Sequence, residues 1–173
     1  MTQKFANSAD KSIYWIIGSF IVLAVIAIGF VAFRESQGLV KVATYGIDAV
    51  SKPKATVVSS LTDLGKMKVT DEKKAEFTLE NTGDKPLQLF RITSSCGCTF
   101  GSVTINGVKG PEFSMHSNSN WTGELPPGQK AIVTVTYKPS IMPVKGEVTR
   151  AVYVSTNDPD NKELTFSVKA YVE

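Results

Sequence analysis

The two cysteines of the chain lie one residue apart, in the segment Ser94-Ser95-Cys96-Gly97-Cys98-Thr99. Thiolates are soft ligands, and Cu(I) prefers sulfur, so a close thiol pair could bind this ion. Further soft donors stand in predicted loops, where binding residues tend to lie. One hypothesis is therefore a copper site formed by Cys96, Cys98, His116, Met115 and Met142.

Two other interpretations of the cysteine pair stay open. The pair could exchange between dithiol and disulfide in an oxidising compartment, and a ring closed over one residue is strained, which eases reduction. The spacing differs, however, from the Cys-x-x-Cys of exchange motifs and zinc modules. In the structural interpretation, the cysteines are small buried hydrophobes and Gly97 allows a tight bend. His116, Met115 and Met142 are then ordinary loop, core or rim residues.

The rest of the chain offers little chemistry. A single histidine without a Gly-x-Ser-x-Gly segment does not indicate a hydrolase triad. The segment Gly107-Val108-Lys109-Gly110 lacks the P-loop pattern, so nucleotide binding is not indicated. The net charge of +3 is spread along the chain without a long basic run, which argues against nucleic-acid binding. We expect no enzyme, and no cofactor apart from the copper alternative.

Short strands must position the cysteines. Between residues 131 and 137, and again between 164 and 172, apolar side chains occupy every second position, as in strands with one buried face. Turn-forming clusters such as Asn81-Thr82-Gly83-Asp84 and Thr156-Asn157-Asp158-Pro159 separate the runs. No stretch beyond residue 33 shows helical periodicity over ten residues. The pattern predicts an all-β, immunoglobulin-like antiparallel β-sandwich of six to eight strands.

Four motifs in order carry a family resemblance: Phe77 to Leu87 (FTLENTGDKPL), Ser95-Cys96-Gly97-Cys98-Thr99, Pro127-Gly128-Gln129, and Ser155-Thr156-Asn157-Asp158-Pro159. With them the chain resembles a bacterial family whose domain is immunoglobulin-like, of the ASH/Hydin type, and is marked by a Cys-Gly-Cys-Thr motif. The resemblance covers roughly residues 70 to 173. It implies the fold, and it leaves the function open because the family has no settled biochemical role.

The longest apolar run lies near the N-terminus, from Ile13 to Phe33, without a charged residue. As a helix it would reach roughly 32 Å, which matches the hydrocarbon core of a bilayer. The sequence therefore predicts a cytoplasmic tail (1–12), a transmembrane helix (13–33) that contacts the lipid bilayer, a juxtamembrane stalk (34–53) and an Ig-like domain (54–173). The short polar tail suits a signal-anchor that exports the domain to the periplasm or cell surface.

The preferred functional hypothesis is a membrane-anchored, non-enzymatic binding or scaffold module of the cell envelope with a protein partner. The first alternative is an extracytoplasmic copper-binding protein that uses Cys96 and Cys98 with His116 and methionine ligands. The second is a thiol-disulfide exchange factor.

Overall fold

The computed structural model describes residues 9–36, 42–117 and 120–173, and within the N-terminal helix it describes the side chains of residues 14–30. The described chain forms two compact units, a helical one and one that holds all the strands. The helical unit is α1 (Ala9–Ser36). The predicted tail (1–12) and stalk (34–53) fall partly outside the described residues.

The properties of the helix contradict the predicted membrane anchor. Within the described residues, no helix is both long enough and apolar enough to cross a membrane. The predicted transmembrane helix (13–33), and with it the single-pass protein with a cytoplasmic N-terminus and an extracytoplasmic domain, is therefore wrong. Contact of residues 13–33 with a lipid bilayer is not supported either.

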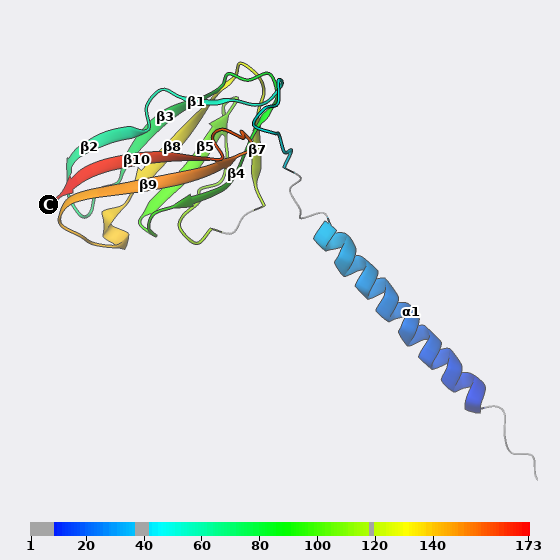
Figure 1. Cartoon of the computed structure of the whole chain (residues 1–173). Coiled ribbons are helices and arrows are strands. Elements are labelled where there is room, and N and C mark those ends of the chain that lie inside the picture. The colour runs from blue at the N-terminus through cyan, green and yellow to red at the C-terminus, as the bar shows by residue number, and fades with distance from the viewer. Residues whose placement is uncertain (1–8, 37–41, 118–119) are drawn as a thin grey trace, which may run out of the picture. The chain divides into compact units, whose positions relative to one another are not determined.

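The second unit is built from short strands and one 3-10 turn (Figure 1). The strands are β1 (Ala55–Val57), β2 (Leu61–Met67), β3 (Lys73–Asn81), β4 (Leu87–Ser94), β5 (Thr99–Ile105), β6 (Val108–Lys109), β7 (Thr122–Leu125), β8 (Lys130–Tyr137), β9 (Gly146–Thr156) and β10 (Glu163–Val172), and the turn is η1 (Pro139–Ile141).

These strands form two five-stranded sheets, which we call sheet A (β1-β3-β8-β5-β6) and sheet B (β2-β10-β9-β4-β7). The predicted sandwich is confirmed, and its antiparallel character holds for sheet A. In sheet B, β2 pairs in parallel with β10, so this sheet is mixed. The ten strands in the described part of the chain exceed the expected six to eight, because short edge strands such as β6 and β7 are too brief to show an alternating pattern.

The core lies between the sheets and follows the predicted alternation. In β8 the side chains of Ala131, Val133 and Val135 are buried, and in β10 the set Leu164, Phe166, Val168, Ala170 and Val172 is buried. The rings of Phe77 in sheet A and Phe166 in sheet B lie 5.4 Å apart across the interior. Burial of this apolar surface is the main source of stability for such a sandwich.

Asn81 explains the first turn motif of the chain. Its side chain is fully buried, and its amide nitrogen donates hydrogen bonds to the carbonyl oxygens of Lys85 (2.8 Å) and Leu125 (2.9 Å). Its amide oxygen accepts from the backbone nitrogens of Lys54 (3.3 Å) and Gly83 (3.1 Å). One side chain thus joins three separate segments, which is why the motif places an asparagine at this position.

Candidate functional site

The cysteine loop crosses from one sheet to the other. Ser94 ends β4 in sheet B, and Thr99 begins β5 in sheet A, so residues 95–98 connect the two layers. Cys96 and Cys98 form a disulfide with a Cα–Cα distance of 5.3 Å. The two cysteines are therefore an oxidised pair in this structure, the state that the exchange hypothesis requires for one half of its cycle.

The disulfide is buried and surrounded by hydrogen bonds. Cys98 is fully buried and Cys96 is 8% exposed. The Thr99 hydroxyl lies 3.2 Å from Cys96 Sγ, and because a disulfide sulfur carries no hydrogen, the hydroxyl is the donor. The Ser94 hydroxyl donates to the Cys96 carbonyl oxygen at 2.7 Å. Burial of both sulfurs limits direct attack by another protein's thiol, which weakens the exchange hypothesis in this conformation.

Met142 lies next to the cysteine loop. It follows η1 in the loop between β8 and β9, and the backbone nitrogen of Lys138 at the start of that loop donates to the Cys98 carbonyl oxygen at 2.9 Å. A Cβ atom placed on Gly97 would lie 3.9 Å from Met142 Sδ. The thioether therefore sits over the open side of Gly97, and Met142 is 48% exposed. The structure places Met142 beside Gly97 of the cysteine loop, and its role as a metal ligand stays a prediction.

Met115 and His116 belong to a different segment. They lie in a turn between β6 and β7 in which the Ser117 nitrogen donates to the Ser114 carbonyl oxygen at 3.1 Å. Met115 is 41% exposed. Across residues 9–36, 42–117 and 120–173, no three His, Cys, Asp or Glu side chains are grouped so that they could hold a metal ion. His116 thus does not complete a metal group with Cys96 and Cys98, and the five-residue copper site stays a prediction.

Arg150 and Tyr137 place unusual polar groups near the cysteine loop. Tyr137 is the cross-strand partner of Thr99, and the Arg150 guanidinium carbon lies 5.9 Å from the centre of the Tyr137 ring. The Tyr137 hydroxyl and the Arg150 Nε are buried without a hydrogen-bond partner among the described residues. Buried unpaired polar atoms are rare and each calls for an explanation. Tyr137 is the strand neighbour of the threonine that touches the disulfide, and Arg150 packs against Tyr137.

An ion pair flanks the same loop. The Lys138 amino group lies 2.9 Å from a Glu72 carboxylate oxygen and 5.3 Å from the centre of the Phe100 ring. The hydrogen bond from Lys138 lowers the pKa of Glu72, and the same bond raises the pKa of Lys138. Glu72 is exposed and Lys138 is half-buried, and an ion pair this open to solvent contributes little to the stability of the fold.

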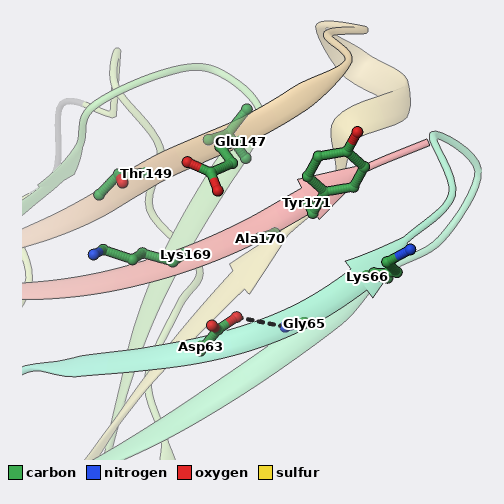
Figure 2. A pocket seen from close by; sticks show the side chains of 9 residues that line it. Asp63, Gly65, Lys66, Glu147, Thr149, Lys169, Ala170 and Tyr171 are labelled. Atoms are coloured by element: carbon green, nitrogen blue, oxygen red, sulfur yellow. Dashed lines mark hydrogen bonds between the residues drawn. The ribbon is translucent and has the colours of Figure 1, made fainter.

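A second candidate site, which sequence reasoning missed, is a hollow on sheet B. It measures about 610 Å³ and is lined by side chains from β2, β9 and β10, namely Asp63, Gly65, Lys66, Glu147, Val148, Thr149, Lys169, Ala170 and Tyr171. Figure 2 shows these side chains standing on three adjacent strands. We call it the sheet B hollow.

The pairing register arranges the sheet B hollow in two rows. Lys169 lies opposite Asp63 on β2 and Thr149 on β9, and Tyr171 lies opposite Lys66 on β2 and Glu147 on β9. The two carboxylates, Asp63 and Glu147, therefore lie at opposite corners, and Lys169 lies in the middle of its row. The parallel pairing of β2 with β10 creates this arrangement, and no local motif in the sequence signals a pairing between segments about a hundred residues apart.

Comparisons with solved structures agree with the fold. A protein of unknown function from Porphyromonas gingivalis W83 superposes with a TM-score of 0.52 at 18% identity, over 72% of this chain and 49% of that one. The chain thus spans about half the length of that protein. The ASH/PapD-like domain 7 of human CEP192 matches with a TM-score of 0.46, at 14% identity, over 78% of this chain and 98% of that one. The Vibrio cholerae protease VesB matches with a TM-score of 0.43, at 13% identity, over 69% and 31%.

Family membership rests on the sequence match rather than on these distant structures. No curated protein matches the chain. A family model for the HYDIN/CFA65/VesB-like, Ig-like domain matches residues 53–170, which is most of the chain. The predicted resemblance to Hydin-type domains is confirmed, whereas a link between that family and the Cys-Gly-Cys-Thr motif stays a prediction. The chain belongs to the HYDIN/CFA65/VesB-like, Ig-like domain family.

Proposed function

We propose that this chain is a non-enzymatic Ig-like binding module that recognises an extended segment of a partner protein at the sheet B hollow. The observation that carries the proposal is a pair of opposite charges without partners on a rigid sheet face. Neither Lys169 nor Glu147 forms an ion pair with any residue that the structure describes. Charges left unpaired on an ordered sheet are available to a partner without an internal ion pair being broken first.

The geometry of the hollow favours a peptide-like occupant. Its side chains stand on hydrogen-bonded strands, so their spacing is fixed by the sheet ladder. Tyr171 stands between Lys66 and Glu147 and is 46% exposed, and a large rigid ring of this kind is common at protein interfaces. An acidic side chain of the partner would face Lys169, and a basic one would face Glu147. Such complementarity selects partners and speeds encounter.

The experiment uses photo-crosslinking in the full-length chain expressed in its own host. A photoreactive amino acid replaces Thr149 in the sheet B hollow, and a control chain carries it at Glu76, an exposed position on the outer face of sheet A. We expect one discrete adduct from position 149 and none of that mass from position 76. Because crosslinking to an unidentified protein is not sufficient evidence, the crosslinking experiment is repeated with chains that also carry a charge reversal.

The charge reversals decide the outcome. Lys169→Glu should abolish the adduct at position 149, whereas Lys85→Glu, an exposed lysine elsewhere on the domain, should leave its yield unchanged. Raising the salt concentration should also lower the yield, because exposed charges are screened over about 10 Å at 0.1 M salt. Equal yields from positions 149 and 76, or a yield indifferent to Lys169→Glu, would contradict the proposal.

A further inference from the structure

We infer that, once the Cys96–Cys98 disulfide is reduced, the cysteine loop and Met142 form a three-sulfur binding site for Cu(I). The site differs from the five-residue set expected from composition, because it excludes Met115 and His116 and takes its donors from two loops that the fold brings together. It is independent of the sheet B hollow.

Met142 and the cysteine loop lie side by side for a structural reason. The hydrogen bond from the Lys138 nitrogen to the Cys98 carbonyl oxygen, 2.9 Å long, fixes the start of the β8–β9 loop against the cysteine loop. Gly97 has no side chain, so Met142 Sδ approaches to 3.9 Å from the point that a Cβ atom would occupy. Two thiolates and a thioether are a donor set that selects a soft ion over Mg²⁺ or Ca²⁺.

The surroundings suit a site that gains negative charge. Two thiolates with one Cu(I) carry a net charge of −1, which a dry interior tolerates only beside a positive charge or hydrogen-bond donors. The Thr99 hydroxyl already donates to Cys96 Sγ at 3.2 Å. Tyr137, opposite Thr99, carries a buried hydroxyl without a partner, and the Arg150 guanidinium beside its ring has a buried Nε without one. The strand neighbour of Thr99 thus carries an unused donor, and a cation lies against its ring.

The chemistry balances with a dithiol as the reductant. The reductant gives two electrons and two protons to the Cys96–Cys98 bond and leaves as its own disulfide, which produces two thiols on the chain. Cu(I) then displaces both thiol protons to solvent and binds the two thiolates, with Met142 Sδ as the third donor. In the oxidised chain no thiolate exists, so copper binding and the disulfide exclude each other.

The test measures Cu(I) binding by the full-length chain under anaerobic conditions. The chain is reduced with a water-soluble phosphine, freed of reductant, and titrated with Cu(I) in competition with a chromogenic Cu(I) chelator. The oxidised wild-type chain serves as a control that has the same sequence and fold. We expect one Cu(I) per reduced chain and none per oxidised chain, with X-ray absorption reporting sulfur neighbours only.

Matched methionine variants separate this site from binding by any dithiol. Met142→Leu should weaken Cu(I) binding at least about 10-fold, which is the lower end of the loss seen when residues that support a metal site are removed. Met115→Leu and His116→Ala should bind as the wild type does. Absence of stoichiometric binding by the reduced chain, equal affinity of Met142→Leu and wild type, or a nitrogen neighbour in the absorption spectrum would overturn the inference.

Discussion

The carboxylate of Asp158 accepts a hydrogen bond of 2.9 Å from the backbone nitrogen of Ala55, 103 residues earlier in the chain. Asp158 lies in the turn between β9 and β10 of sheet B, and Ala55 begins β1 of sheet A. The same carboxylate accepts from the Asp160 nitrogen and the Asn161 side-chain amide, each at 2.9 Å. A fully buried carboxylate therefore ties the two sheets together, and this tie accounts for the aspartate in the second turn motif.

Asp158→Asn should lower the free energy of unfolding by about 1.5–3 kcal/mol at neutral pH, because hydrogen bonds to a charged group are lost. The amide keeps the shape of the carboxylate but turns one acceptor into a donor that faces other donors. Urea unfolding followed by circular dichroism measures the change. Asp48→Asn, at an exposed aspartate, is the matched control and should stay within about 0.5 kcal/mol of wild type.

Asp158 also predicts a pH dependence. Burial raises the pKa of this carboxyl, but the hydrogen bonds from Ala55, Asn161 and Asp160 outweigh burial and leave the pKa below 3.8. The unfolded chain therefore binds the proton more readily, so the stabilisation from this group is fully present above the unfolded pKa and is lost as the pH falls through the folded one. The stability difference between wild type and Asp158→Asn should shrink in acid. A constant difference from neutral pH down to pH 3 would contradict this explanation.

Asn81→Ala should cost about 2–4 kcal/mol, because each buried backbone group left without a partner costs about 1–3 kcal/mol. The change leaves the carbonyl oxygens of Lys85 and Leu125 without the donor that Asn81 now supplies. Chemical denaturation of Asn120→Ala, at an exposed asparagine, provides the comparison. Similar midpoints for both variants would show that the Asn81 hydrogen bonds are dispensable.

Gly101 and Val152 should be energetically coupled. A Cβ on Gly101 in β5 would overlap Val152 Cγ1 in β9, because the sheets approach closely there. Gly101→Ala should lower the free energy of unfolding by about 1–3 kcal/mol through overpacking. Adding Val152→Ala removes the overlapping methyl groups, so the double variant should be less destabilised than the sum of the single variants by about 0.5–3 kcal/mol.

The control for this cycle is Gly46→Ala, where an added Cβ meets nothing within 4 Å. We expect its stability to match wild type within about 0.5 kcal/mol. Strict additivity of Gly101→Ala and Val152→Ala in equilibrium unfolding would show that the two sheets can separate locally at no cost.

Reduction of the disulfide should leave the domain folded. The closed loop contains only Cys96, Gly97 and Cys98, and so short a loop constrains the unfolded chain by about 1–2 kcal/mol. Urea unfolding of the oxidised and the phosphine-reduced chains should therefore differ by about this amount, with equal slopes. Loss of a cooperative transition on reduction would mean that the cysteine loop holds the sandwich together.

The sandwich could be predicted because its central strands bury one face. β10 alternates between apolar and polar side chains, and in β8 every second residue is apolar while the other face is mostly threonine, so both strands are recognisable from the sequence alone. β2 could not be predicted from the sequence because it lies at the edge of its sheet. There Gly65 adopts a φ of +67° and interrupts the alternation of apolar and polar residues. Edge strands gain little from burial, so their sequences carry little pattern.

The candidate sites, like the strands, could be predicted only in part from the sequence. Ligand softness alone grouped Met142 with the cysteines, and in the structure Met142 lies beside Gly97, the residue between them. The same reasoning added His116, because residue types say nothing about which loops meet at one end of a sandwich. The sheet B hollow was invisible for a related reason: its charges belong to three strands whose pairing is set by tertiary contacts.

The parallel pairing of β2 with β10 has a consequence for biosynthesis. β10 lies between β2 and β9, so until residues 163–172 have left the ribosome β2 lacks its neighbour and β9 is paired with β4 alone. A nascent chain that stops before this point carries two unpaired strand edges, which are templates for aggregation. Emergence of β10, rather than of the first strands, is the event that closes sheet B.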